Sequence, residues 1–150
     1  MAVTKIRDNL YISGCRDATE DDLRKLGVTN ILNVADDAKT IETLWGSDIQ
    51  RDTFSFSDNP TSANDRGQWA ADFAKELLEE GKILLIHCKV GNSRSPHIAA
   101  LALSQIEKVS YDQIYEEIRR LRPSVMKYSM RQAIIDLDSN WIDKLRDING

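Results

Sequence analysis

The chain has 150 residues, of which 41% are hydrophobic and 29% charged, which is the size and composition of one soluble globular domain. Only seven Gly and three Pro interrupt it, which excludes low-complexity disorder, and no apolar stretch is long enough to cross a bilayer. A net charge of −4 and a pI near 5.2 disfavour binding to nucleic acid or anionic lipid through long-range charge, so we treat residues 1–150 as one domain, expect no nucleic-acid or membrane partner, and take a monomer as the default.

The chain opens with two predicted strands and a helix. Val3 to Arg7 and Leu10 to Ser13 have strand patterns and are joined at Asp8-Asn9, a good turn sequence. Thr19-Glu-Asp-Asp22 resembles a capping box, which predicts the start of a helix, and Gly27 predicts its end.

Two further strands and a helix are predicted next. The β-branched and apolar run from Val28 to Ala35 indicates a buried strand, and the alternation from Ile49 to Phe56 indicates another, which ends in a loop over residues 57–60. From about Asp65 to Glu80 an apolar side chain recurs every four positions. This spacing predicts a helix whose apolar stripe packs in the core: Trp69, Phe73 and Leu77.

The second half of the chain continues this alternation. Lys82 to His87 contains a continuous apolar run suited to a central parallel strand. The helix that contains Ile98 to Leu103 is apolar nearly all round and is therefore expected to be buried, and two amphipathic helices are predicted over Ser110 to Leu121 and Ser129 to Leu145. Strands alternating with helices predict an α/β fold with a central, mostly parallel sheet flanked by helices.

The signals for targeting, disulfides and metals are weak. Met1 to Asp8 contain no apolar core segment, so we expect neither a secretory signal nor a transit peptide and, by default, a cytoplasmic location. Two Cys and two His are too few for a disulfide framework, and the adjacent His87 and Cys88 are poorly spaced to chelate one metal. We expect reduced thiols, no metal and no cofactor.

One segment carries most of the chemistry, because a strand ends, a short loop follows and a helix begins within Ile86-His-Cys-Lys-Val-Gly-Asn-Ser-Arg-Ser-Pro96. Backbone N–H groups of such a loop can turn inward around a tetrahedral oxyanion while the helix N-terminus adds partial positive charge. Gly91 is expected to supply the unusual φ angle that the curl needs. The predicted phosphate-binding residues are Lys89, Val90, Gly91, Asn92, Ser93 and Arg94.

The two ends of this loop carry complementary groups. Cys88 offers a thiol, and Arg94 offers a planar guanidinium that can bind two oxygens of the same anion. A helix N-terminus and a nearby arginine both favour a thiolate, so we expect Cys88 to react in that form at neutral pH.

His-Cys-x5-Arg-Ser after an apolar strand resembles the cysteine-dependent protein phosphatases, and the chain as a whole resembles a compact dual-specificity phosphatase domain. Three further segments occur in the order that this family uses: Leu10-Tyr-Ile-Ser-Gly14, Ile31-Leu-Asn-Val-Ala35 and Leu121-Arg-Pro123. The resemblance covers nearly all of the chain.

The resemblance implies a role for three residues. Cys88 attacks phosphorus to give a phosphocysteine, and Arg94 holds two oxygens of the transition state. The family also uses an acid on a separate loop some thirty residues before the nucleophile, and Asp58 fits that place. Asp52 and Asp65, in a strand and at a helix start, are worse placed.

Other residues near the loop have two interpretations each. Ser95 either caps the helix before Pro96 or, as the resemblance implies, helps the thiolate to leave in the second step. His87 is expected to support the loop without acting as a general base. Lys89 either favours acidic or multiply phosphorylated substrates or is simply solvated, and Cys15 is either a redox partner of Cys88 or a quiet thiol.

Two features lie at and just after the end of the fourth predicted helix. Its C-terminal arginines are expected to be structural, because cations suit that end of a helix: Arg119, Arg120 and Arg122. After Pro123 many relatives carry a Pro-Asn pair where this chain has Val125-Met-Lys-Tyr128, which leaves open the contact of this segment with the loop.

The sequence therefore indicates a phosphatase that acts on phosphotyrosine and on phosphoserine or phosphothreonine in proteins, with phosphorylated proteins as its partners. The larger tyrosine-specific relatives deepen their pocket with an added loop, for which this chain has no room. The alternatives are the same chemistry on an inositol lipid or an RNA 5′ phosphate, or a phosphate-binding module with little turnover. A binding module would normally lack the Cys or the Arg, and both are present.

Overall fold

A computed structural model describes residues 3–40 and 48–137, which form a five-stranded sheet between two layers of helices. The strands are β1 (Thr4–Arg7), β2 (Leu10–Gly14), β3 (Asn30–Ala35), β4 (Gln50–Phe56) and β5 (Leu84–Cys88), in the order β1-β2-β5-β3-β4. Only β1 runs antiparallel to its neighbour. The mostly parallel sheet with β5 at its centre confirms the fold class predicted from the sequence.

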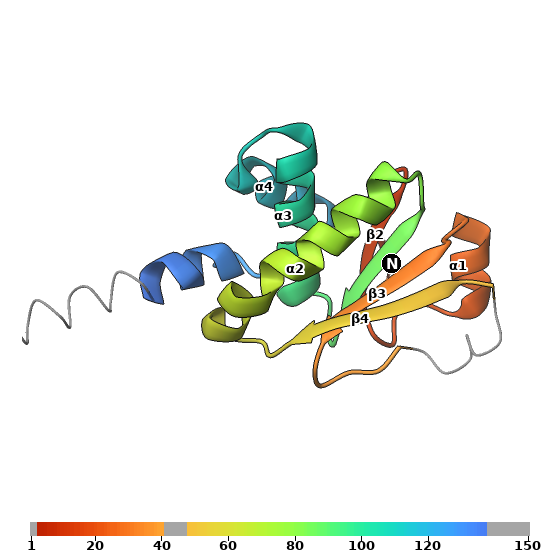
Figure 1. Cartoon of the computed structure of the whole chain (residues 1–150), viewed down its shortest axis with the longest axis horizontal. Coiled ribbons are helices and arrows are strands. Elements are labelled where there is room, and N and C mark those ends of the chain that lie inside the picture. The colour runs from red at the N-terminus through yellow and green to blue at the C-terminus, as the bar shows by residue number, and fades with distance from the viewer. Residues whose placement is uncertain (1–2, 41–47, 138–150) are drawn as a thin grey trace, which may run out of the picture.

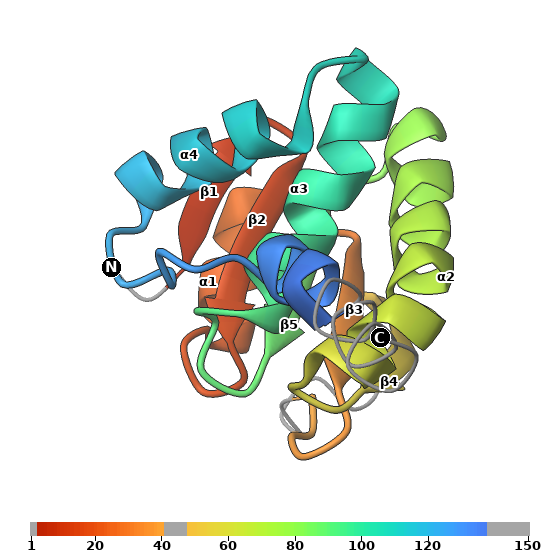
Figure 2. The same ribbon diagram turned by 90° about the vertical axis from the view of Figure 1, so that its left-hand side faces the viewer.

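The helices divide between the two faces of the sheet (Figures 1 and 2). α1 (Glu20–Leu26) packs on one face, where its Leu23 contacts the cluster that contains Tyr11, Ile31 and Leu85. The opposite face carries the main core and three helices: α2 (Pro60–Glu79), α3 (Arg94–Glu107) and α4 (Tyr111–Leu121). None of the described helices has the length and apolar character needed to span a membrane.

The predicted capping of α1 is present. The Thr19 hydroxyl accepts a hydrogen bond from the Asp22 backbone N–H at 3.1 Å, and the Asp22 carboxylate accepts one from the Thr19 N–H at 3.2 Å. Gly27 ends the helix at φ 75°, a conformation that glycine adopts without strain.

The prediction for α2 is wrong at its start and on its apolar face. The helix begins at Pro60, with the Asn59 side chain accepting from the Ser62 N–H at 2.8 Å, so part of the predicted loop is helix. Trp69 is 67% exposed, whereas Leu77 is buried and Phe73 is partly buried. Each step of four residues turns about 40° past a full turn of a 3.6-residue helix, so a stripe with this spacing rotates out of the core.

Small residues form the buried face of α2 instead: Ala63, Gly67, Ala70, Ala71 and Ala74, followed by Leu77 and Leu78. They allow α2 to lie close to the buried helix α3, as Figure 2 shows. Residues 130–137 are helical, and the remainder of the helix predicted over Ser129 to Leu145 lies outside the described residues.

Candidate active site

The loop between β5 and α3 lies at the carboxyl end of the central strand. Cys88 is the last residue of β5 and is 2% exposed, and α3 begins at Arg94. The Gly91 backbone N–H donates to Cys88 Sγ at 3.2 Å, and Ser95 Oγ lies 3.3 Å from the same sulfur. The thiol is thus surrounded by groups that can donate hydrogen bonds to a thiolate.

Gly91 has the positive φ predicted from the sequence, 89°. A Cβ at this position would lie 2.6 Å from the Gly14 backbone nitrogen and 2.7 Å from the Ser13 carbonyl carbon. The close approach of these two loops therefore requires glycine, as does the backbone angle.

Ser95 does not cap α3, so the capping interpretation is wrong. The helix begins two residues earlier, at Arg94, with Ser93 at the N-cap position and without a side-chain cap. Ser95 is fully buried within the first turn, and its hydroxyl also lies 3.5 Å from the Ser13 carbonyl oxygen. This places the hydroxyl against the sulfur of Cys88.

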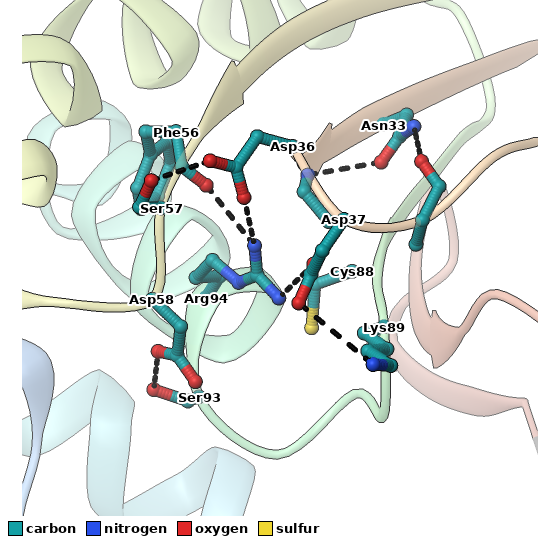
Figure 3. Close-up of polar contacts among 12 residues, drawn as sticks. Asn33, Asp36, Asp37, Phe56, Ser57, Asp58, Cys88, Lys89, Ser93 and Arg94 are labelled. Atoms are coloured by element: carbon teal, nitrogen blue, oxygen red, sulfur yellow. Dashed lines mark hydrogen bonds and ion pairs between the residues drawn. The ribbon is translucent and has the colours of Figure 1, made fainter.

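The guanidinium of Arg94 is 3% exposed and lies among acceptors from the end of β4 and from the turn that follows β3. Its Nη1 donates to the Phe56 carbonyl oxygen at 3.0 Å and to Asp36 Oδ1 at 3.3 Å, and its Nη2 donates to Asp37 Oδ1 at 2.7 Å (Figure 3). Because of this hydrogen bond to Arg94, the pKa of Asp37 lies below its ordinary value. Asp36 and Asp37 were not predicted as site residues.

A buried asparagine shapes the turn that carries these two aspartates. Asn33 Oδ1 accepts from the Ala35 N–H at 2.9 Å, and its Nδ2 donates to the Ala38 carbonyl oxygen at 2.8 Å (Figure 3). Asn33 belongs to the Ile31–Ala35 segment singled out in the sequence. Its two hydrogen bonds fix the backbone on both sides of Asp36 and Asp37.

Asp58 follows β4 and is exposed, and its Oδ1 accepts from Ser93 Oγ at 2.9 Å (Figure 3). This hydrogen bond joins the predicted acid to the phosphate-binding loop. Asp52 lies within β4, and Asp65 lies within α2 rather than at its start.

His87 is buried with its ring beside the phosphate-binding loop. Its Nε2 lies 3.1 Å from Thr40 Oγ1, and its Nδ1 lies 3.3 Å from the Cys88 carbonyl oxygen. Burial lowers the pKa of His87, so the ring is neutral at neutral pH. A neutral ring that contacts the backbone of Cys88 suits the supporting role predicted for it.

Arg122 binds the phosphate-binding loop through hydrogen bonds to its backbone, a contact that the sequence did not reveal. Its Nε donates to the Gly91 carbonyl oxygen at 3.0 Å, and its Nη2 donates to the Val90 carbonyl oxygen and to Asp17 Oδ2, each at 3.2 Å. Asp17 also accepts from the Gly14 N–H at 2.6 Å. The side chain of Arg122 thus contacts the loop instead of the end of α4, so the explanation from the helix dipole is wrong for this residue.

The segment after Pro123 also contacts the loop, which answers the question left open above. The Met126 backbone N–H donates to the Asn92 carbonyl oxygen at 3.0 Å, and Ser124 Oγ donates to Asn92 Oδ1 at 2.9 Å. The departure from the sequence of many relatives therefore keeps a contact between this segment and the loop.

Lys89 and Cys15 lie at the edge of the loop. Lys89 is exposed, with its Nζ 4.0 Å from Asp37 Oδ2. The Cys15 N–H donates to the Lys89 carbonyl oxygen at 3.1 Å. Cys15 and Cys88 are both free thiols.

Comparison with known proteins identifies the same family as the sequence motifs. Residues 10–139 match the family model described as dual specificity phosphatase, catalytic domain. Dual specificity protein phosphatase 12 of Homo sapiens is 27% identical over 122 residues, which are 79% of this chain and 36% of that protein. Dual specificity protein phosphatase PHS1 of Arabidopsis thaliana is 28% identical over 144 residues, 93% of this chain and 16% of that protein. The chain thus spans about a third or less of these relatives.

Solved structures share the fold. The crystal structure of human DUSP28 has a TM-score of 0.77 at 16% identity, covering 94% of this chain and 95% of that chain. The crystal structure of DUSP15 has a TM-score of 0.74 at 21% identity, covering 88% and 84%. These matches confirm the fold predicted from the resemblance.

Proposed function

The chain belongs to the dual-specificity phosphatase family. From this membership and the geometry of the site we propose that it hydrolyses phosphotyrosine, and also phosphoserine or phosphothreonine, in proteins. The proposed reaction passes through a phosphocysteine intermediate. The observation that carries the proposal is the buried Cys88 sulfur, held between the Gly91 N–H and the Ser95 hydroxyl at the end of β5. The partners are phosphorylated proteins, and the proposed location is the cytoplasm.

In the first step the Cys88 thiolate attacks phosphorus and the bond from phosphorus to the leaving oxygen breaks. The loop N–H groups and the Arg94 guanidinium stabilise the charge on the equatorial oxygens. Asp58 gives its proton to the leaving oxygen. Its hydrogen bond to Ser93 supports this role, because it joins the acid to the loop that holds the phosphate.

In the second step water attacks the phosphocysteine, and the bond between sulfur and phosphorus breaks. Asp58, now a carboxylate, takes a proton from the water. The departing thiolate accepts a hydrogen bond from Ser95 Oγ, which lies 3.3 Å from the sulfur. Inorganic phosphate then leaves, and Cys88 returns to its starting form.

An open loop supports substrates of more than one length. Val90, on the loop itself, is 61% exposed, and the neighbouring Lys89 is exposed as well. A phosphoserine or phosphothreonine side chain is shorter than a phosphotyrosine side chain, so its phosphate reaches the nucleophile only if the pocket around the nucleophile is shallow. The exposure of these two side chains supports the proposal that shorter substrates also reach Cys88.

A turnover panel tests the proposal: an aryl phosphate, phosphotyrosine and phosphothreonine peptides, an inositol phosphate and an RNA with a 5′ phosphate. We expect the aryl phosphate and both peptides to be hydrolysed with a chelator present, because the thiolate, Arg94 and the loop amides supply the charge that the transition state needs. Vanadate and iodoacetate should stop turnover. Preference for the inositol phosphate or the RNA would contradict the protein substrate, and loss of activity on chelation, restored by a divalent ion, would contradict the thiolate mechanism.

A further inference from the structure

Asp37 makes the shortest hydrogen bond to the guanidinium that the proposed mechanism assigns to the substrate. Its Oδ1 lies 2.7 Å from Arg94 Nη2, and its side chain is 48% exposed. Figure 3 shows the carboxylate of Asp37 between Arg94 and Lys89, on the side of the guanidinium away from Asp58. A carboxylate at this donor competes with any other anion for it.

The donors of Arg94 have separate tasks. Nη1 is bound to the Phe56 carbonyl oxygen and to Asp36, and Asp36 in turn accepts a hydrogen bond from Ser57. Nε is buried and bonds no atom in the part of the chain that the structure describes. A phosphate that binds the guanidinium through two parallel hydrogen bonds must therefore use Nε and Nη2. Asp37 already accepts a hydrogen bond from one of the two N–H groups of Nη2, which places a negative charge beside any phosphate bound there.

We propose that Asp37 is a displaceable carboxylate that competes with the substrate phosphate for Arg94 Nη2 and so sets the affinity of the site for phosphate. This inference rests on the proposed function. Asp36 has a different role: it holds Nη1 and orients the guanidinium. Two adjacent aspartates with the same charge thus act in opposite senses on substrate binding.

The surroundings of Asp37 allow the side chain to move while the backbone stays in place. The hydrogen bonds of Asn33 to Ala35 and Ala38 hold the turn. The carboxylate borders an open cavity of about 910 Å³, also lined by Lys89. Lys89 Nζ is 4.0 Å from Asp37 Oδ2, so the carboxylate can pair with this ammonium group when phosphate binds Nη2.

The first test compares the wild type with Asp37→Asn and Asp37→Ala in hydrolysis of an aryl phosphate and in inhibition by vanadate. A competing internal group lowers the apparent affinity of the site, because phosphate binds only those molecules in which the group has moved away. Removing the carboxylate should therefore lower both KM and the vanadate inhibition constant by about three- to tenfold. The value of kcat should stay within about twofold, because Asp37 has left Arg94 before the reaction begins. Unchanged KM and inhibition constants would overturn the proposal.

Asp36→Asn is the matched control for net charge. It removes the same charge one residue away, while Nη1 keeps its hydrogen bond to the Phe56 carbonyl oxygen and Asp37 still occupies Nη2, so its KM should not fall. If both substitutions lower KM to the same extent, the effect is one of overall charge, and the competition of Asp37 for Nη2 is refuted.

A binding experiment separates failure of this inference from failure of the proposed function. Inorganic phosphate is titrated into Cys88→Ser and into the double variant Cys88→Ser, Asp37→Asn, neither of which needs to turn over. The double variant should bind phosphate about three- to tenfold more tightly. Equal binding of phosphate by the two variants would refute only the role proposed for Asp37. A wild-type chain that hydrolyses no phosphate ester would refute the proposed function.

Discussion

At the scale of single residues, Asp58 has the role that depends most on the substrate. General acid catalysis contributes about 10²–10⁴-fold and matters most when the departing oxygen is too basic to leave as an anion. Asp58→Asn should therefore lose far more rate on phenyl or alkyl phosphate than on an activated nitroaryl phosphate. Steady-state rates across a series of leaving groups measure this difference.

The controls for Asp58 are the two aspartates on either side of it in the sequence. Asp52 lies in β4 and Asp65 in α2, and Asp65 is exposed. Asp52→Asn and Asp65→Asn should behave nearly as the wild type with every leaving group. If either shows the dependence expected of Asp58→Asn while Asp58→Asn does not, the acid has been assigned to the wrong residue.

Single residues also differ in how far the sequence reveals them. Cys88, Gly91 and Arg94 could be singled out because their spacing after an apolar strand is informative by itself. Asp36 and Asp37 could not, because two aspartates after a strand have no distinctive spacing. They acquire a role only because β3 pairs with β5 in parallel, which brings the end of β3 beside Arg94.

At the scale of elements, the loop depends on Arg122, a buried side chain that arrives from beyond α4. Arg122→Ala removes donors from the Gly91 and Val90 carbonyl oxygens and from Asp17. We expect kcat/KM to fall at least about tenfold and the free energy of unfolding to fall by about 1–3 kcal/mol, the cost of leaving buried polar groups unpaired. Kinetics and urea denaturation of the same preparation measure both.

Arg120→Ala is the control for Arg122, because Arg120 is an exposed arginine near the end of the same helix. It should change the free energy of unfolding by no more than about 0.5 kcal/mol, the usual range for a surface substitution, and should leave kcat/KM within about twofold of the wild type. Equal losses in the two variants would show that the loop does not depend on the hydrogen bonds of Arg122.

Most elements were predictable, and the errors have physical causes. The capping box of α1 and the apolar run of β5 are local signals, so the sequence alone identifies them. The start of α2 was placed too late because Asn59-Pro60 is as typical of a turn as of a helix start. The contact of Arg122 with the loop joins residues that are 31 apart in the sequence, and no local pattern reports such a contact.

At the scale of the whole molecule, a buried histidine links stability to pH. His97 in α3 lies 2.8 Å from the Tyr111 hydroxyl in α4, and burial, with a smaller effect from the positive charge of Arg131, lowers its pKa to about 4. The unfolded chain binds this proton near pH 6.5, so the folded state is favoured in full above that pH and loses stability as the pH falls towards 4. Burial of His87 acts in the same direction.

We therefore expect the free energy of unfolding of the wild type to fall between pH 7 and pH 4.5, with His97 contributing up to about 3 kcal/mol over its full titration. His97→Asn should be less stable at pH 7 but should lose less between the two values, because asparagine does not titrate. Urea denaturation at both pH values measures the difference. An equal loss in the variant would contradict the assignment to His97.

The central claim for the molecule is that Cys88 becomes phosphorylated during turnover, and mass spectrometry of the rapidly quenched reaction tests it most directly. A nitroaryl phosphate is mixed with the enzyme, the reaction is stopped within one turnover, and the peptide that contains Cys88 is analysed. We predict the mass of one added phosphoryl group on Cys88 in the wild type, and neither this adduct nor turnover in Cys88→Ser. A phosphoryl group on another residue, or near wild-type turnover by Cys88→Ser, would contradict the account.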